Sequence, residues 1–350
     1  MRTKVIAALL AVLTALGGLN LFQSIKKKIM PVEHETIVMS ESREVHERVK
    51  VRSEVRVRER VIARVRVNTN SDEVMIEESF SVDNGDDLII NITHADVTIL
   101  TGSGNRAEIE ITLDSRNMRA AVERFEDMDW RVYKEGDAIH IEADELRGNW
   151  NTSMDIDVLI FIPATFNIDL ETSHGDVELG DLMGSLKLLT SHGDVEMGEV
   201  EGSTIWIKSS HGDIEAVELR SEQVEVQTSH ADIEVGAIYS KRFDATTSHA
   251  DVEIGYLEGE TSISTSHGDI EVYLNGDSSA SFTTQHGDVD VFVDSDIEAD
   301  FDLRGADVNM SRSLRLNGRV DDDRVEGSVN GGGRTIKART THGSVSVRSN

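Results

Sequence analysis

The chain has 350 residues, no Cys and a formal net charge of −30 at pH 7. Without Cys it can form neither a disulfide nor a thiolate metal site, and it cannot carry a lipid anchor on Cys. So large a negative charge repels nucleic acid and attracts cations and basic partners, so we expect no nucleic-acid function.

Residues 1–30 predict a signal peptide or a membrane anchor. Arg2 and Lys4 precede an apolar run over residues 5–22, and three lysines follow it at residues 26–28. The small residues Ala15 and Gly17 offer a signal-peptidase site, whereas the length of the whole run suits a retained membrane tether. Both interpretations predict an exported protein whose folded body lies outside the cytoplasm; in a bacterium it would be periplasmic, at the cell surface or anchored in the membrane of the cell envelope.

Residues 31–71 form a charged connector between this segment and the folded body. Valines alternate with Arg and Glu there, and a period of two favours a strand. However, Val57, Val61 and Val65 also share one helical face, so the pattern leaves both structures open.

Residues 72–170 begin the folded body, with a helical insert predicted near residues 115–128. The insert interrupts a β pattern, and its apolar residues Met118, Ala121, Val122, Phe125 and Met128 recur at helical spacing. We expect this helix to cover an open end or side of the sheet.

Residues 171–350 carry a tandem repeat, Thr-Ser-His-Gly-Asp-Val-Glu, whose copies follow one another at steps of 18 or 19 residues. A short fixed period with β-branched residues at alternate positions predicts an all-β, single-domain parallel β-solenoid, or β-helix. Each coil is expected to contain two short strands and two turns, with the repeated phrase at a corner. The residue after His is Gly, or Ala at Ala231 and Ala250, which suggests that only a small side chain is needed there.

The same register places His, Asp and Glu on the side of each coil opposite the core. Strands in a sheet lie about 4.8 Å apart, so each residue type should form a row facing solvent. Adjacent carboxylates suit Ca²⁺, and neighbouring His and Asp suit Zn²⁺ or copper. The alternative is a structural corner, in which Thr, Ser and Asp bind turn backbone. The candidate metal ligands are His174, Asp176, His192, Asp194, His211, Asp213, His230, Asp232, His249, Asp251, His267, Asp269, His286 and Asp288.

Imidazole also titrates near pH 6.5, which suggests a third role for these residues, in pH sensing. A neighbouring Asp would raise the pKa and a neighbouring protonated His would lower it, so the sequence leaves the direction open.

Catalytic motifs are not found in the sequence. There is no Gly-x-Ser-x-Gly, phosphate-binding loop, His-Glu-x-x-His or Cys nucleophile. The carboxylates repeat uniformly instead of gathering at one coil, so we expect the protein not to be an enzyme and to need no cofactor.

The chain resembles the bacterial putative-adhesin family of unknown function, whose members have toastrack-like domains. The resemblance rests on Phe161-Ile162-Pro163, the repeated Thr-Ser-x-Gly-Asp unit and the glycine-rich stretch at residues 327–333, and it covers roughly residues 75–350. It implies an exported or tethered β-solenoid without known catalysis, and roles in adhesion, sensing or scaffolding. His stands in most coils where the family has Ser, which is a departure from the family pattern.

These observations predict a non-catalytic, exported solenoid that presents an acidic His/Asp/Glu face for binding. The expected partners are cations, a glycan, a cationic polymer or surface, or another envelope protein. The alternative is a membrane-tethered sensor or scaffold module of the envelope.

Overall fold

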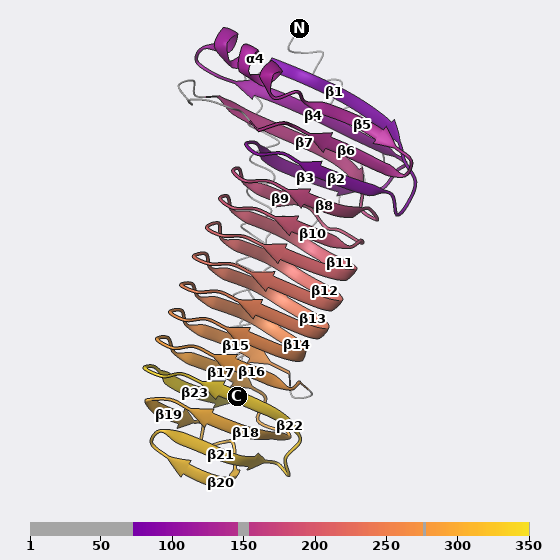
Figure 1. The fold of residues 1–350 in the computed structure, drawn as a ribbon. Coiled ribbons are helices and arrows are strands. Elements are labelled where there is room, and N and C mark those ends of the chain that lie inside the picture. Colours follow the sequence, from indigo (N-terminus) through magenta and orange to yellow (C-terminus); the bar gives the residue numbers. More distant parts are fainter. Residues whose placement is uncertain (1–72, 146–153, 276–277, 350) are drawn as a thin grey trace, which may run out of the picture.

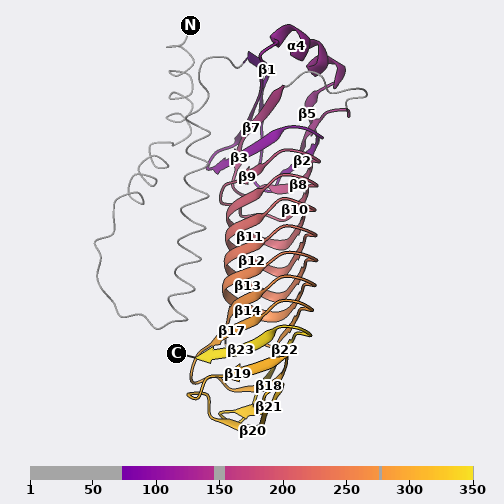
Figure 2. The same ribbon diagram turned by 90° about the vertical axis from the view of Figure 1, so that its left-hand side faces the viewer.

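The computed structural model describes residues 73–145, 154–275 and 278–349. They form one elongated stack of strands, with β1 and α4 at one end and β20 and β21 at the other (Figures 1 and 2). The predictions for residues 1–30 and 31–71 lie outside the described residues. Within the described residues there is no helix long and apolar enough to cross a membrane.

The centre of the stack consists of parallel strands in strict register. Val195 pairs with Ile214, and Ile214 pairs with Ile233 one coil later. The expected solenoid architecture is therefore observed, but the expected division into two short strands fails in four coils, where pairing continues through the predicted turn. The bounds here are β9 Val177–Leu179, β10 Leu186–Leu189, β11 Val195–Lys208, β12 Ile214–Gln227, β13 Ile233–Thr246, β14 Val252–Ser264, β15 Ile270–Leu274, β16 Ala280–Thr283 and β17 Val289–Val293.

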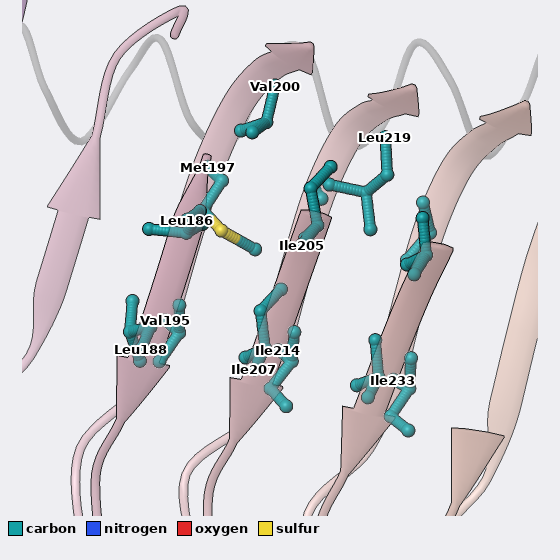
Figure 3. Close-up of a cluster of buried hydrophobic side chains, with 14 of the residues drawn as sticks. Leu186, Leu188, Val195, Met197, Val200, Ile205, Ile207, Ile214, Leu219 and Ile233 are labelled. Carbon is teal, nitrogen blue, oxygen red and sulfur yellow. The ribbon is translucent and has the colours of Figure 1, made fainter. Parts of the chain in front are cut away.

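The core lies inside the coils and is built from two facing rows of apolar side chains (Figure 3). Val195 and Met197 belong to one row, and Ile205 and Ile207 of the same strand belong to the other; all four are fully buried. Burial of a side chain of this size contributes about 1.5–3 kcal/mol, and each coil repeats the arrangement. The core thus fixes which residues face outward.

The N-terminal part is folded back on itself. β2 lies between β6 and β8, and β3 lies between β7 and β9, so the chain leaves the stack after β3 and returns above it. The helix predicted near residues 115–128 is present as α4, Met118–Asp127, and its Ala121 and Phe125 are buried. The strands are β1 Glu73–Ser81, β2 Asp87–Asn91, β3 Asp96–Gly102, β4 Arg106–Asp114, β5 Arg131–Glu135, β6 Ala138–Glu142, β7 Asp155–Pro163 and β8 Asn167–Glu171.

The C-terminal part also contains strands that insert between strands distant in the sequence, here at the other end of the stack. β22 inserts between β16 and β18, and β23 inserts between β17 and β19. The coil that comes last in the sequence, in which Ser344 replaces the repeated Asp, is therefore an internal coil of the structure. The strands are β18 Ala299–Arg304, β19 Asp307–Met310, β20 Leu316–Asp321, β21 Arg324–Val329, β22 Arg334–Arg339 and β23 Ser344–Ser349.

Candidate binding face

A single stack of imidazole rings runs along one edge of the solenoid. Neighbouring ring centroids are 4.6–4.9 Å apart and neighbouring planes are within 5° of parallel. All of the rings are exposed except that of His94, which is half-buried. In spatial order the stack contains His94, His174, His192, His211, His230, His249, His267, His286 and His342.

The repeated phrase holds each ring at a corner of the coil. The backbone N–H of His211 donates to the carbonyl of Ser191 in the preceding coil, and the later copies repeat this bond. The residue two positions before His is a buried Thr in most coils and the buried Ser209 in one, and at Thr284 the hydroxyl donates to the carbonyl of Gly268 at 3.0 Å. Because the backbone bond recurs from coil to coil, successive rings lie directly above one another.

The position after His restricts the backbone conformation as well as the size of the side chain in some coils. Gly175 and Gly193 have φ of +125° and +144°, a conformation that disfavours any residue with a Cβ. The expectation that only smallness matters is therefore wrong in these two coils. It does describe Ala231 and Ala250, which are buried at the same position.

The Asp row is a hydrogen-bonded ladder that ties successive coils together. One carboxylate oxygen of each Asp accepts the backbone N–H of the equivalent residue in the next coil, at 2.7–3.0 Å. The ladder runs through Asp96, Asp176, Asp194, Asp213, Asp232, Asp251, Asp269 and Asp288 to the N–H of Ser344. The interpretation of the phrase as a structural corner thus describes what one Asp oxygen does.

From Asp213 to Asp288 the side chains of this row are also exposed. In this stretch the second carboxylate oxygen has no hydrogen-bond partner among the described residues. One oxygen therefore serves the fold and the other is presented to the surroundings.

The Glu row beside it is less open than the sequence predicted. Glu178 and Glu196 are each only 3% exposed, which corrects the expectation that the whole row faces solvent. Glu215 and its successors are half-buried. A shallow groove lies between the Asp and Glu rows, lined by Asp213, Glu215, Asp232, Ile233, Glu234, Asp251 and Glu253. The groove wall is acidic, with a single apolar residue.

The rows do not converge as metal ligands do. Among the described residues, no group of three or more His, Asp or Glu side chains is placed to hold a metal ion. Parallel rings direct their nitrogen lone pairs along parallel planes, whereas tetrahedral Zn²⁺ needs donors that point at one centre about 2 Å away. The assignment of His174 through Asp288 as Zn²⁺ or Ca²⁺ ligands stays a prediction without a convergent donor set.

His94, at the half-buried end of the stack, has a lowered pKa. Burial, and then the neighbouring His174, lower the pKa of His94, while Glu145 acts in the opposite direction. The buried end of the stack therefore resists protonation.

His94 and His342 extend the face beyond the seven tandem copies in the sequence. Both occur within recognisable copies of the phrase, Thr93-His94-Ala95-Asp96 and Thr341-His342-Gly343. Their place in the stack follows from the two insertions described above. A partly exposed row of Tyr239, Tyr256 and Tyr273, with centroids 5.3 and 5.7 Å apart, was not anticipated, because its spacing from His changes between coils.

The Toastrack DUF4097 family profile matches residues 85–348. The chain belongs to this family. No curated protein matches it.

A solved "putative adhesin" from Bacteroides fragilis NCTC 9343 is 12% identical, over 81% of this chain and 98% of that one, with a TM-score of 0.38. A "putative lipid binding protein" from Parabacteroides distasonis ATCC 8503 is 12% identical over 80% and 98%, with a TM-score of 0.45. A "putative adhesin" from Parabacteroides merdae ATCC 43184 is 9% identical over 80% and 97%, with a TM-score of 0.44.

Proposed function

We propose that this Toastrack protein is a non-catalytic binding module of the bacterial envelope that presents its His/Asp/Glu face to a cationic partner. The partner would be a cationic polymer or a basic segment of another envelope protein. The observation that supports this most is the exposed Asp ladder from Asp213 to Asp288, which borders a groove lined almost entirely by carboxylates.

The regularity of the face suits a linear partner. Carboxylates recur at each coil, about 4.8 Å apart, so a chain of positive charges can meet one carboxylate after another. Each contact is weak, because an ion pair 4 Å apart in water is worth only about 1 kcal/mol. Affinity would therefore come from many contacts made together, and it would fall as salt screens them.

The same regularity argues against catalysis. Active sites place different groups around one reacting centre, with pKa values that environment has shifted apart. In this face, by contrast, each row repeats the same chemical group from coil to coil. Evenly spaced charges suit a long ligand better than a small substrate.

Binding of fluorescent poly-L-lysine to the full chain at low ionic strength tests the proposal. The variant Asp213→Asn, Asp232→Asn, Asp251→Asn keeps an oxygen acceptor for each ladder hydrogen bond and removes three charges. Its matched control, Glu201→Gln, Glu260→Gln, Glu298→Gln, removes three exposed charges outside the groove.

We expect the Asn variant to bind at least tenfold more weakly than the wild type and the control to change by less than about twofold. Equal losses in the two variants would mean that the polymer senses only net charge, and the proposed face would then be wrong.

A further inference from the structure

The strand β1 is an open edge at one end of the stack, and it is separate from the His/Asp/Glu face. Among the described strands it pairs with β4 alone, and Figure 1 shows it at the end that also carries α4. An edge strand presents unpaired backbone N–H and C=O groups to which another strand can bind. β1 has nine residues, so this edge is long. Solenoid ends of this kind need a cap.

Apolar side chains of β1 are incompletely covered. Val74 is 48% exposed, and Ile76 and Phe80 pack against the core but stay half-buried. Ile76 lies opposite the buried Ile111 of β4, and Phe80 lies opposite the buried Ala107, so both point to the core side of the sheet. A further strand beside β1 with apolar side chains on that side would cover Ile76 and Phe80.

The outer side of the same edge is acidic. β1 and β4 together contain six acidic residues and a single basic residue, Arg106. Glu77 lies directly opposite Glu110, and like charges in this arrangement destabilise a sheet. Burial and then Glu77 raise the pKa of Glu110. A neighbouring strand with basic side chains on the outer side would offset this repulsion.

The sequence just before β1 has this two-faced pattern. Residues 60–67 read Arg-Val-Ile-Ala-Arg-Val-Arg-Val and contain no acidic residue. Successive side chains of a strand point to opposite faces, so an extended segment would have an apolar face of three Val and one Ala. The other face would carry three Arg and Ile62. Residues 68–72, Asn-Thr-Asn-Ser-Asp, are of the types that form turns.

We propose that residues 61–67 dock as an antiparallel strand on the free edge of β1, with residues 68–72 as the connecting loop. A loop of this length is usual between antiparallel neighbours. So short a tether also gives the segment an effective concentration in about the millimolar range, which favours it over the same segment of a second copy. The basic and apolar faces of the segment match the acidic and apolar sides of the edge.

The register follows from the loop and from an irregularity in β1. The pairing of β1 with β4 skips Met75. With the same skip on the free edge, apolar residues of the segment lie on the core side and Arg64 lies on the outer side. The resulting cross-strand pairs are Val65 with Ile76, Arg64 with Glu77 and Val61 with Phe80. The docked strand thus closes this end of the sheet, and β1 no longer offers a template to another chain.

Hydrogen exchange of the β1 amides in the full chain tests the docking, because the amides that do not face β4 are protected only when a second strand binds them. The variant Val61→Ser, Val65→Ser removes the apolar contacts of the docked segment. Its matched control, Val51→Ser, Val55→Ser, makes the same changes at the same spacing outside that segment. Circular dichroism melting checks that the body of each variant folds.

We expect β1 amides on both edges to be protected in the wild type, and the outer-edge amides to exchange about tenfold or more faster in the first variant. The control should change by less than about twofold. Protection should be equal at protein concentrations about tenfold apart, because the occupant belongs to the same chain. Unprotected outer-edge amides in the wild type, equal exchange in the two variants, or protection that is lost on dilution would each overturn the proposal.

A charge exchange tests the register. Arg64→Glu and Glu77→Arg should each speed exchange of the outer-edge amides about threefold or more, because each places like charges opposite one another. The double variant restores an opposite-charge pair, so its exchange should return to within about twofold of the wild type. A double variant that exchanges as fast as the single variants would overturn the pairing of Arg64 with Glu77.

Discussion

Replacement of Asp194 separates the structural role of the Asp ladder from its charge. Oδ1 of Asp194 accepts the N–H of Asp213 at 3.0 Å, and its own N–H donates to Asp176 at 3.0 Å. Asp194→Ala removes a hydrogen bond to a charged acceptor, worth about 1.5–3 kcal/mol. It also relieves repulsion from the carboxylates above and below, roughly 1 kcal/mol for each at this spacing in water. Asp194→Asn brings the same relief and keeps an acceptor.

The difference between the two variants therefore isolates the hydrogen bond. We expect Asp194→Asn to be at least as stable as the wild type and Asp194→Ala to be about 0.5–1.5 kcal/mol less stable than Asp194→Asn, because the bond that Asn keeps has a neutral acceptor. That corresponds to a melting temperature lower by about 1–5 °C for a body of this size. Hydrogen exchange should show faster exchange of the Asp213 amide in the Ala variant alone. If Ala and Asn melt together and the Asp213 amide exchanges equally in both, the ladder does not hold the coils.

Three further predictions concern pH and backbone geometry. Because burial and His174 lower the pKa of His94, the unfolded chain binds this proton more readily, and stability should fall as pH drops from about 6.5 through the folded-state pKa. His94→Gln should reduce the loss of melting temperature on acidification, and an unchanged pH profile would contradict this. Because burial and Glu77 raise the pKa of Glu110, the ionised form is disfavoured, so Glu110→Gln should raise the melting temperature at neutral pH. The gain should vanish below about pH 4, where the carboxyl is protonated in both states, and a gain that persists there would point to packing instead. Gly175→Ala places a Cβ 2.0 Å from the Ala95 carbonyl oxygen at a φ of +125°, and it should cost about 2 kcal/mol or more in urea unfolding. A loss below about 0.5 kcal/mol would mean that this coil adjusts as the Ala-containing coils do.

The central architecture follows directly from the sequence. The period of the repeat predicts the in-register rows, because residues at equal positions in successive coils must pair. Strand parity then predicts that Val195 and Met197 face inward while His192 and Asp194 face outward, as they do.

The two insertions could not be predicted from the period. In the sequence, the segment that contains β18 to β21 separates His286 from His342. The two rings stack nevertheless, because β22 and β23 insert between strands that precede them in the sequence. Sequence order defines neighbours only while the chain advances one coil at a time. A copy of the phrase outside the tandem run therefore identifies a candidate His but does not indicate where that His lies in the stack.

The exposure and the hydrogen-bond partners of the acidic side chains could not be predicted from the sequence either. Parity indicates which side of a strand Glu178 lies on, but its exposure depends on packing beyond the strand itself. Similarly, the phrase indicates that Asp can accept a backbone hydrogen bond. It does not indicate that the donor is an N–H group of the next coil instead of one in the same turn. Both facts depend on the stacking of coils.

Binding of oligolysines of increasing length tests the central claim most directly. The exposed part of the ladder, from Asp213 to Asp288, has five carboxylates at steps of about 4.8 Å, and an extended peptide advances about 3.3 Å for each residue. The affinity of the full chain should rise with peptide length up to about six lysines and then level off. It should fall at least tenfold, for the longest peptide, in the variant Asp213→Asn, Asp232→Asn, Asp251→Asn. Affinity that does not depend on peptide length, or that this variant leaves unchanged, would contradict a continuous cation-binding face.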